Sequence, residues 1–126
     1  MQSNRGRDTR PELRLRSHVH ALGLRYRVDA QPLPGLRRRA DLVFRRARVA
    51  VFLDGCFWHG CPQHYSAPGA NASFWAEKVA GNAARDRETD RALAAAGWVA
   101  LRFWEHEDPA EAAAAIQAVV TKRLAT

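Results

Sequence analysis

Apolar residues recur along the chain with two kinds of spacing, which together predict a mixture of helices and strands. Residues 10–22, 73–96 and 109–125 have apolar positions at helical spacing or a composition that favours helix. Four shorter stretches have the alternation or the continuous apolar run of strands, namely 24–30, 37–44, 49–54 and 98–104. The predicted order is therefore α-β-β-β-α-β-α, that of an α/β protein with one domain over residues 1–126.

Residues that prefer helix ends support these boundaries. Thr9 can cap the first helix while Glu12, three residues on, reaches back toward it. Asp108 followed by Pro109 is a typical start for the last helix. The side chains expected to face the core are Leu15, Val19 and Leu22 in the first helix and Phe74, Val79, Ala83 and Leu93 in the second.

The charge of the chain favours a polyanionic partner. Lys and Arg number 20 against 13 Asp and Glu, for a net charge of +7, and only Lys78 and Lys122 are lysines. Arginine has a planar fork of donors that suits phosphate, although a GC-rich genome could also produce this composition. No stretch has the roughly 20 apolar residues of a membrane span, and the N-terminus lacks a signal-peptide pattern. We therefore expect a cytoplasmic protein with no membrane partner.

Metal-binding residue types gather in the segment VFLDGCFWHGCPQH, residues 51–64. Cys56, Cys61 and His64 fall within nine residues of a Gly- and Pro-rich loop, and sulfur and imidazole donors suit Zn²⁺. A structural zinc site needs a fourth ligand, and His106 follows a strand that could lie beside the one ending at Asp54. The alternative is a pair of buried free cysteines with surface histidines.

Two acids mark the same edge of the predicted sheet. Asp41 lies among apolar residues in ADLVF, where a carboxylate is costly unless it is paired or bound to a metal. Asp54 ends the next strand, so the two carboxylates could hold Mg²⁺ as nucleases do, or Asp54 could merely terminate its strand. His59 beside such a metal could act as a general base or acid. Phe57 and Trp58 are either core residues or wedges that stack on DNA bases.

Several segments together resemble the very short patch repair endonucleases, in matching order over nearly the whole chain. The segments are DGCFWHGCP, the upstream LPG and ADLVF, the downstream FWAEKVAGNAARDRETDRALAAAGW, and LRFWEHE. The resemblance implies a restriction-endonuclease-like core of the PD-(D/E)XK type, with a central mixed sheet flanked by helices and a zinc-braced loop. It also implies an enzyme that nicks DNA beside the thymine of a T:G mismatch.

Residue roles follow from that resemblance where the motifs match. Asp41 corresponds to the acid that binds catalytic Mg²⁺, together with the backbone carbonyl of Leu53, and His59, Glu12 and Asp86 correspond to further active-site groups. Structural Zn²⁺ is expected on Cys56, Cys61, His64 and His106, where the family frequently has a cysteine at the last position. DNA contacts are expected from Phe57, Trp58, Met1, Arg5, Arg7, Lys78, Asn82 and Arg85.

The expected partner is double-stranded DNA carrying a T:G mismatch, bound by a monomer that associates with the bacterial nucleoid. Two alternatives stay open. One keeps the site but cuts a specific sequence, as homing or restriction nucleases do. The other is a zinc-braced DNA-binding module without catalysis. A zinc hydrolase for small molecules is disfavoured, because four zinc ligands would close the metal site.

Overall fold

The computed structural model describes residues 9–55 and 72–125. The element order is the one predicted from the sequence, and the strand at 49–54 has the predicted bounds. The elements are α1 (Arg10–Ala21), β1 (Arg27–Ala30), β2 (Ala40–Phe44), β3 (Val49–Asp54), α3 (Ala72–Ala95), β4 (Val99–Trp104) and α4 (Pro109–Leu124). The first two strands begin later than predicted, because the ladder between them runs only from Arg27 opposite Val43 to Ala30 opposite Ala40.

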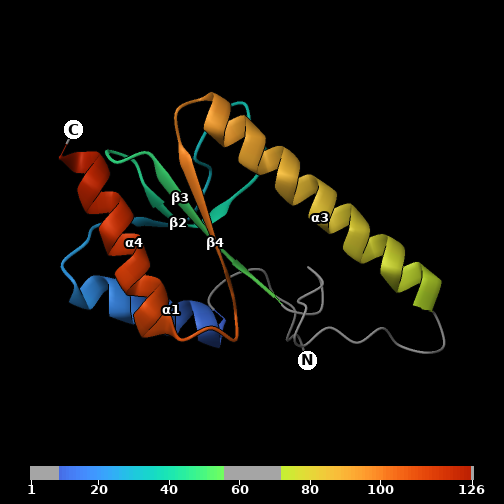
Figure 1. Ribbon diagram of the computed structural model, residues 1–126, viewed down its shortest axis with the longest axis horizontal. Helices are drawn as coiled ribbons and strands as arrows, with labels where there is room; N and C mark the ends of the chain where they lie inside the picture. Colours follow the sequence, from blue (N-terminus) through green and yellow to red (C-terminus); the bar gives the residue numbers. More distant parts are fainter. Residues whose placement is uncertain (1–8, 56–71, 126) are drawn as a thin grey trace.

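The strands form one mixed sheet in the order β1-β2-β3-β4 (Figure 1). The two hairpin pairs are antiparallel, whereas β3 and β4 are parallel and joined by a crossover through α3. The register places Phe52 opposite Arg102 and Asp54 opposite Trp104. The carboxyl ends of β3 and β4 therefore lie at one edge of the sheet, which is the edge where the predicted site residues fall.

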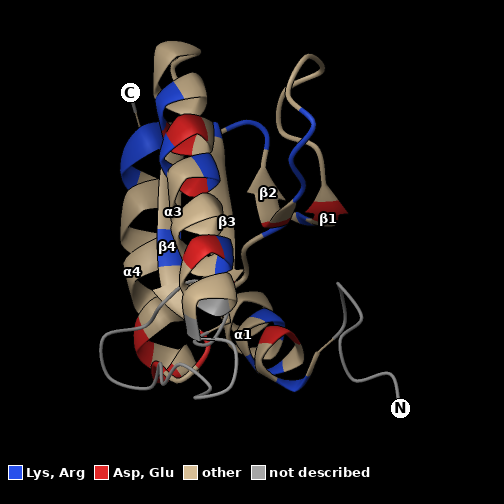
Figure 2. Ribbon diagram, turned by 90° about the vertical axis from the view of Figure 1, so that its right-hand side faces the viewer, with Lys and Arg blue, Asp and Glu red and all other residues tan. Residues whose placement is uncertain are grey.

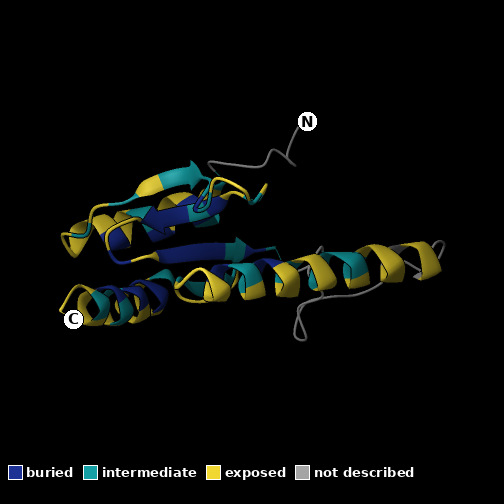
Figure 3. Ribbon diagram, turned by 90° about the horizontal axis from the view of Figure 1, so that it is seen from above, coloured by how far each residue is buried: buried dark blue, intermediate teal, exposed yellow. Residues whose placement is uncertain are grey.

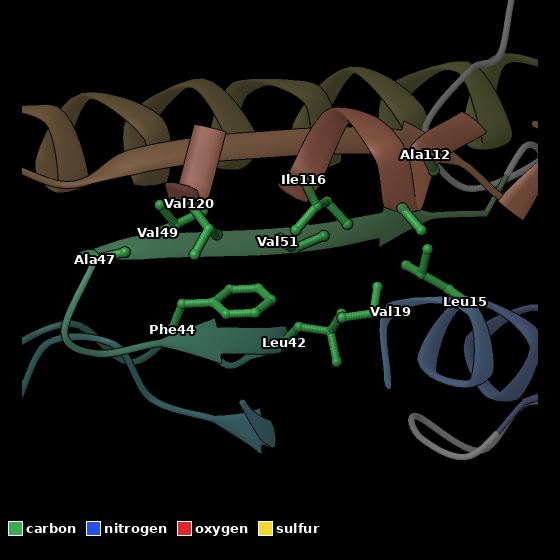
Figure 4. Packing of buried hydrophobic residues seen from close by; sticks show 11 residues of the cluster. Leu15, Val19, Leu42, Phe44, Ala47, Val49, Val51, Ala112, Ile116 and Val120 are labelled. Carbon is green, nitrogen blue, oxygen red and sulfur yellow. The ribbon is translucent and has the colours of Figure 1, made fainter. Parts of the chain in front are cut away.

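Helices cover both faces of the sheet. One face packs against α1 and α4, and its buried cluster draws Leu15 and Val19 from α1, Ile116 and Val120 from α4, and Val51 from β3 (Figure 4). On the other face α3 contributes Leu93, which is fully buried among strand residues. The N-terminal turns of α3 extend past the described part of the sheet and are mostly exposed (Figure 3). Among the described helices, none is long and apolar enough to cross a membrane.

Two of the predicted core residues are exposed. Leu22 is 40% exposed because α1 ends at Ala21 and the chain turns away from the helix face. Phe74 is 51% exposed because it lies in the protruding start of α3. Both predictions were wrong, whereas Leu15, Val19 and Leu93 are buried as predicted and Val79 and Ala83 are half-buried.

The two helix caps also differ from one another. The Asp108 carboxylate accepts the N–H of Ala110 at 2.9 Å and Pro109 is the first residue of α4, as predicted. At α1, the Thr9 side chain makes no capping hydrogen bond, and Glu12 points into the protein, where it is 8% exposed. The predicted reciprocal cap of Thr9 and Glu12 is therefore wrong, which leaves Glu12 available to the site described below.

Candidate active site

Asp41 lies at the centre of the acidic residues predicted from the sequence. It is near the start of β2, and its Oδ2 accepts the backbone N–H of Leu53 at 2.6 Å. Burial is the main cause that raises the pKa of the Asp41 carboxyl from 3.8 to about 7; the Leu53 N–H opposes the rise, and the charges of Glu12 and Asp54 add to it. A nearby cation would reverse this shift, because it favours the charged carboxylate.

Glu12 reaches the same site from α1. It is largely buried, it adds to the raised pKa of Asp41 through its charge and a hydrogen bond, and its Oε1 is 3.4 Å from Nη2 of Arg16. The sequence resemblance placed Glu12 with Asp41, and the packing of α1 beside the start of β2 brings them together. The partly buried Arg16 pairs with Glu12.

Asp54 is held by an arginine from the neighbouring strand. Nη1 of Arg102 lies 3.1 Å from Oδ1 of Asp54 and 3.6 Å from Oδ1 of Asp86. Nη2 of the same guanidinium is 2.9 Å from Oδ1 of Asp90. Burial lowers the pKa of Arg102, but the hydrogen bond to Asp90 and the three negative charges more than offset this, so the pKa is raised.

Arg102 and Asp90 were missed by the sequence analysis, although a signal existed. Arg102 lies within the apolar strand VALRFW, where a charged side chain is costly unless it is paired. The same argument had identified Asp41. In the ribbon, α3 runs alongside β4 (Figure 2). Asp86 and Asp90 lie one turn apart on α3, and both carboxylates reach Arg102 on that strand.

Asp41, Asp54, Asp86 and Arg102 line a common pocket of about 210 Å³. It brings together the predicted residues Asp41, Leu53, Asp54 and Asp86. Arg38 and Arg39, from the segment before β2, form part of its wall and were not predicted. The pocket thus combines carboxylates that can bind a cation with arginines that can bind phosphate.

The predicted zinc ligands fall mostly outside the described residues. Cys56, Cys61 and His64 lie there, so the zinc site stays a prediction. His106 follows β4, whose Trp104 pairs with Asp54, and the expected adjacency of these two strands is therefore confirmed. Within residues 9–55 and 72–125, no group of three or more His, Cys, Asp and Glu side chains is arranged to hold a metal ion.

Three of the predicted DNA contacts share one side of the protruding part of α3. Lys78, Asn82 and Arg85 recur at helical spacing, and the Arg85 guanidinium donates to the Asn82 side chain. The ammonium of Lys78, which is exposed, lies 6.0 Å from the centroid of the Phe74 ring. The other predicted residues are outside the described part of the chain, namely His59, Phe57, Trp58, Met1, Arg5 and Arg7.

Comparison with known proteins gave matches in both sequence and structure. Residues 1–64 match the family model described as DNA mismatch endonuclease Vsr. The nicking enzyme V.NaeI of Lentzea aerocolonigenes is 46% identical over 118 residues, which span 92% of this chain and 71% of that protein. The DNA mismatch endonuclease Vsr of Escherichia coli K12 is 39% identical over 100 residues, which span 79% of this chain and 62% of that protein.

Among solved structures, the catalytic domain of the homing endonuclease I-Bth0305I is similar, with a TM-score of 0.61. The match covers 93% of this chain and 99% of that domain, at 15% sequence identity. The predicted restriction-endonuclease-like fold, with a mixed sheet flanked by helices, is thereby confirmed.

Proposed function

The chain belongs to the Vsr family of DNA mismatch endonucleases and is a DNA endonuclease, and from this premise we propose that it nicks duplex DNA beside the thymine of a T:G mismatch. The observation that carries the proposal is the family match together with the position of Asp41 in an acidic pocket lined by arginines. The names of the similar proteins support both parts, since one is a mismatch endonuclease and another is a nicking enzyme.

The proposed cofactor is Mg²⁺ bound at Asp41. Nucleases of this fold class generally use Mg²⁺, and the ion is commonly held by one or two carboxylates, with water and substrate phosphate completing its six positions. The Asp41 carboxylate and the Leu53 carbonyl would form such a small donor set. The raised pKa of Asp41 also fits, because a cation there would offset the repulsion from Glu12 and Asp54. When bound, Mg²⁺ would neutralise the scissile phosphate and activate water.

The side chains of the chain itself would position the substrate and move the proton. Arg38 and Arg39, in the wall of the pocket, would hold DNA phosphates next to the scissile bond. Glu12 would keep Asp41 oriented and hydrogen-bonded from the side of α1. His59 would exchange a proton with the attacking water or the leaving oxygen, a role that suits an imidazole near neutral pH.

The segment after β3 would supply mismatch recognition. Phe57 and Trp58 would wedge between base pairs, because unstacking is least costly at a mismatched step. Zn²⁺ on Cys56, Cys61, His64 and His106 would brace the segment, since closed sites with sulfur and nitrogen ligands are structural. DNA affinity would then depend on the net charge of +7 and fall steeply with added salt.

A nicking assay on end-labelled duplexes tests the proposal. Two duplexes of one sequence, with either a T:G or a T:A pair, are incubated with the protein in Mg²⁺ and in EDTA. We expect a single nick beside the thymine of the T:G duplex, in Mg²⁺ only. Asp41→Asn should lower the rate by on the order of 10³-fold, because a metal contributes several kcal/mol to the transition state.

Glu111→Gln is the control, because it makes the same change from carboxylate to amide at an exposed residue of α4 that lies outside the active-site pocket. We expect this variant to nick normally. Equal cutting of the two duplexes would contradict mismatch recognition and would support an enzyme that cuts a specific sequence. Binding of DNA without any nicking would support a non-catalytic module.

A further inference from the structure

A groove lies at the opposite end of β2 from Asp41. Three parts of the chain line it, namely the segment that leads from α1 into β1, the end of β2 with the turn that follows, and the last turns of α4. Its volume is about 440 Å³, within the roughly 300–1,000 Å³ that is typical of ligand sites. Among the described residues, none lines both this groove and the active-site pocket, so the two are separate sites.

The floor of the groove is apolar and already formed. Phe44 and Val120 lie together at one end of the buried cluster (Figure 4), and the rings of Tyr26 and Phe44 pack edge to face with their centroids 6.0 Å apart. The Tyr26 hydroxyl donates to the backbone carbonyl of Arg16 at 3.2 Å, which fixes the ring. Leu124 completes the floor and is 49% exposed, so part of this apolar surface is open to water. An apolar centre of this kind is typical of protein interfaces.

The rim of the groove is strongly basic. It has four exposed arginines, namely Arg25, Arg27, Arg45 and Arg46. No Asp or Glu of the described chain lines the groove, and within residues 9–55 and 72–125 none of the four arginines forms an ion pair. Arg45 donates to two backbone carbonyls of the loop after β1, which are neutral and leave its charge unbalanced. By contrast, Arg16, Arg39 and Arg102 each lie beside a carboxylate.

An occupant that matches this groove needs negative charge for the rim and an apolar side chain for the floor. A second copy of this chain is a poor match, because its net charge is +7. Residues 1–8 have two arginines against one aspartate, and residues 56–71 have no Asp or Glu. DNA supplies phosphates for the arginines but would leave the apolar floor unfilled. An acidic protein segment meets both needs, because arginine clusters bind acidic motifs through paired hydrogen bonds to carboxylates.

We propose that this groove binds an acidic segment of a partner protein. Carboxylates of the segment pair with the arginine rim, and a side chain the size of Leu or Phe lies on the floor beside Tyr26 and Leu124. Because the groove is separate from the active-site pocket, the partner can stay bound while DNA occupies that pocket. The inference therefore goes beyond the proposed function and does not depend on which DNA the enzyme cuts.

Selection from a phage-displayed library of short random peptides, with the full chain as bait at near-physiological salt, tests this inference. We expect the enriched peptides to share several Asp or Glu residues around a Leu, Phe or Trp. A fluorescein-labelled enriched peptide should bind the wild type in fluorescence anisotropy. Its Kd should rise at least about tenfold for the double variant Arg25→Gln, Arg46→Gln, because charge-assisted hydrogen bonds are lost. Leu124→Ser should also raise the Kd, because it removes part of the apolar floor.

The double variant Arg87→Gln, Arg91→Gln is the matched control, because it removes the same charge from two exposed positions of α3 that lie outside the groove. We expect this control to bind the peptide as the wild type does, and an equal loss of binding would show attraction to net charge alone and overturn the proposal. A library that yields no acidic peptides would also overturn it.

The other possible occupants give different results. Addition of a T:G duplex should leave the labelled peptide bound, whereas displacement of the peptide would assign the rim to DNA and overturn the proposal. Analytical ultracentrifugation should show no dimer that depends on Leu124, whereas a dimer that Leu124→Ser abolishes would assign the floor to a second copy and overturn it as well.

Discussion

The two faces of the sheet have different compositions, although the same strands contribute to both. The face toward α1 and α4 buries eleven apolar residues in one cluster. Among the described residues, the face toward α3 buries only five, and beyond Phe52 it continues into Asp54, Arg102 and the acids of α3. Stability and chemistry are therefore divided between the two faces, and a strand can contribute to both because its side chains alternate.

This division predicts that core mutations on the two faces differ in their effect on the site. Ile116→Ala on α4 should lower the free energy of unfolding by about 2–5 kcal/mol, because Ile116 is fully buried and the change leaves a cavity. The folded fraction should nick at the wild-type rate. Leu93→Ala on α3 should cost a similar free energy and should also slow nicking, because α3 carries Asp86 and Asp90.

Denaturant unfolding and single-turnover nicking, measured on each variant, check this first prediction. Leu124→Ala is the control, since Leu124 is 49% exposed and its truncation should change stability by no more than about 0.5 kcal/mol. If Ile116→Ala and Leu93→Ala slowed nicking equally, the two faces would not be functionally separate.

A second prediction concerns the pH dependence that Asp41 gives to stability in the absence of divalent cations. The pKa of Asp41 is near 3.8 in the unfolded chain and about 7 in the folded chain. At a pH between these two values, the Asp41 carboxyl is therefore protonated in the folded chain and ionised in the unfolded chain. The contribution of Asp41 to the free energy of unfolding should therefore be fully present below about pH 4 and be lost as the pH rises to 7. The loss should amount to a few kcal/mol at most.

Thermal melts between pH 5 and 8, in buffer without added Mg²⁺ and without a chelator that would remove Zn²⁺, measure that effect. Asp41→Asn should flatten the decline and melt above the wild type at pH 8, because an amide cannot ionise. Added Mg²⁺ should stabilise the wild type at pH 8 and leave Asp41→Asn unchanged, since it binds the ionised carboxylate. A wild type whose stability rises through this pH range would show that Asp41 is ionised when folded.

The smallest expected effect is a difference in stability between variants of two residues that pair with Arg102. Asp54→Asn should cost about 1.5–3 kcal/mol of stability, because the Asp54 side chain is 11% exposed and its charged hydrogen bond is shielded from water. Asp90→Asn should cost at most about 1 kcal/mol, because the Asp90 side chain is 40% exposed and solvent screens the pair. Chemical denaturation of both variants tests the order, and a larger loss for Asp90→Asn would contradict it.

Local patterns in the sequence were enough to predict the elements and part of the site. The run VAVFLD predicted β3 with its observed bounds, and the pair Asp108 and Pro109 predicted the start of α4. Asp41 was predicted because an acid in an apolar strand needs a partner, and the structure places it beside Leu53, Asp54 and Glu12. These features depend on neighbouring residues, so the sequence contains the information directly.

Tertiary structure alone decided which distant groups meet. Arg102 and Asp54 are 48 residues apart, and they pair only because β3 and β4 are parallel with Phe52 opposite Arg102. Asp86 and Asp90 join them because the crossover through α3 passes beside β4. The exposure of Leu22 and Phe74 was likewise decided by where each helix stops contacting the sheet. A helical pattern states which residues share a face, but only packing determines how much of that face is covered.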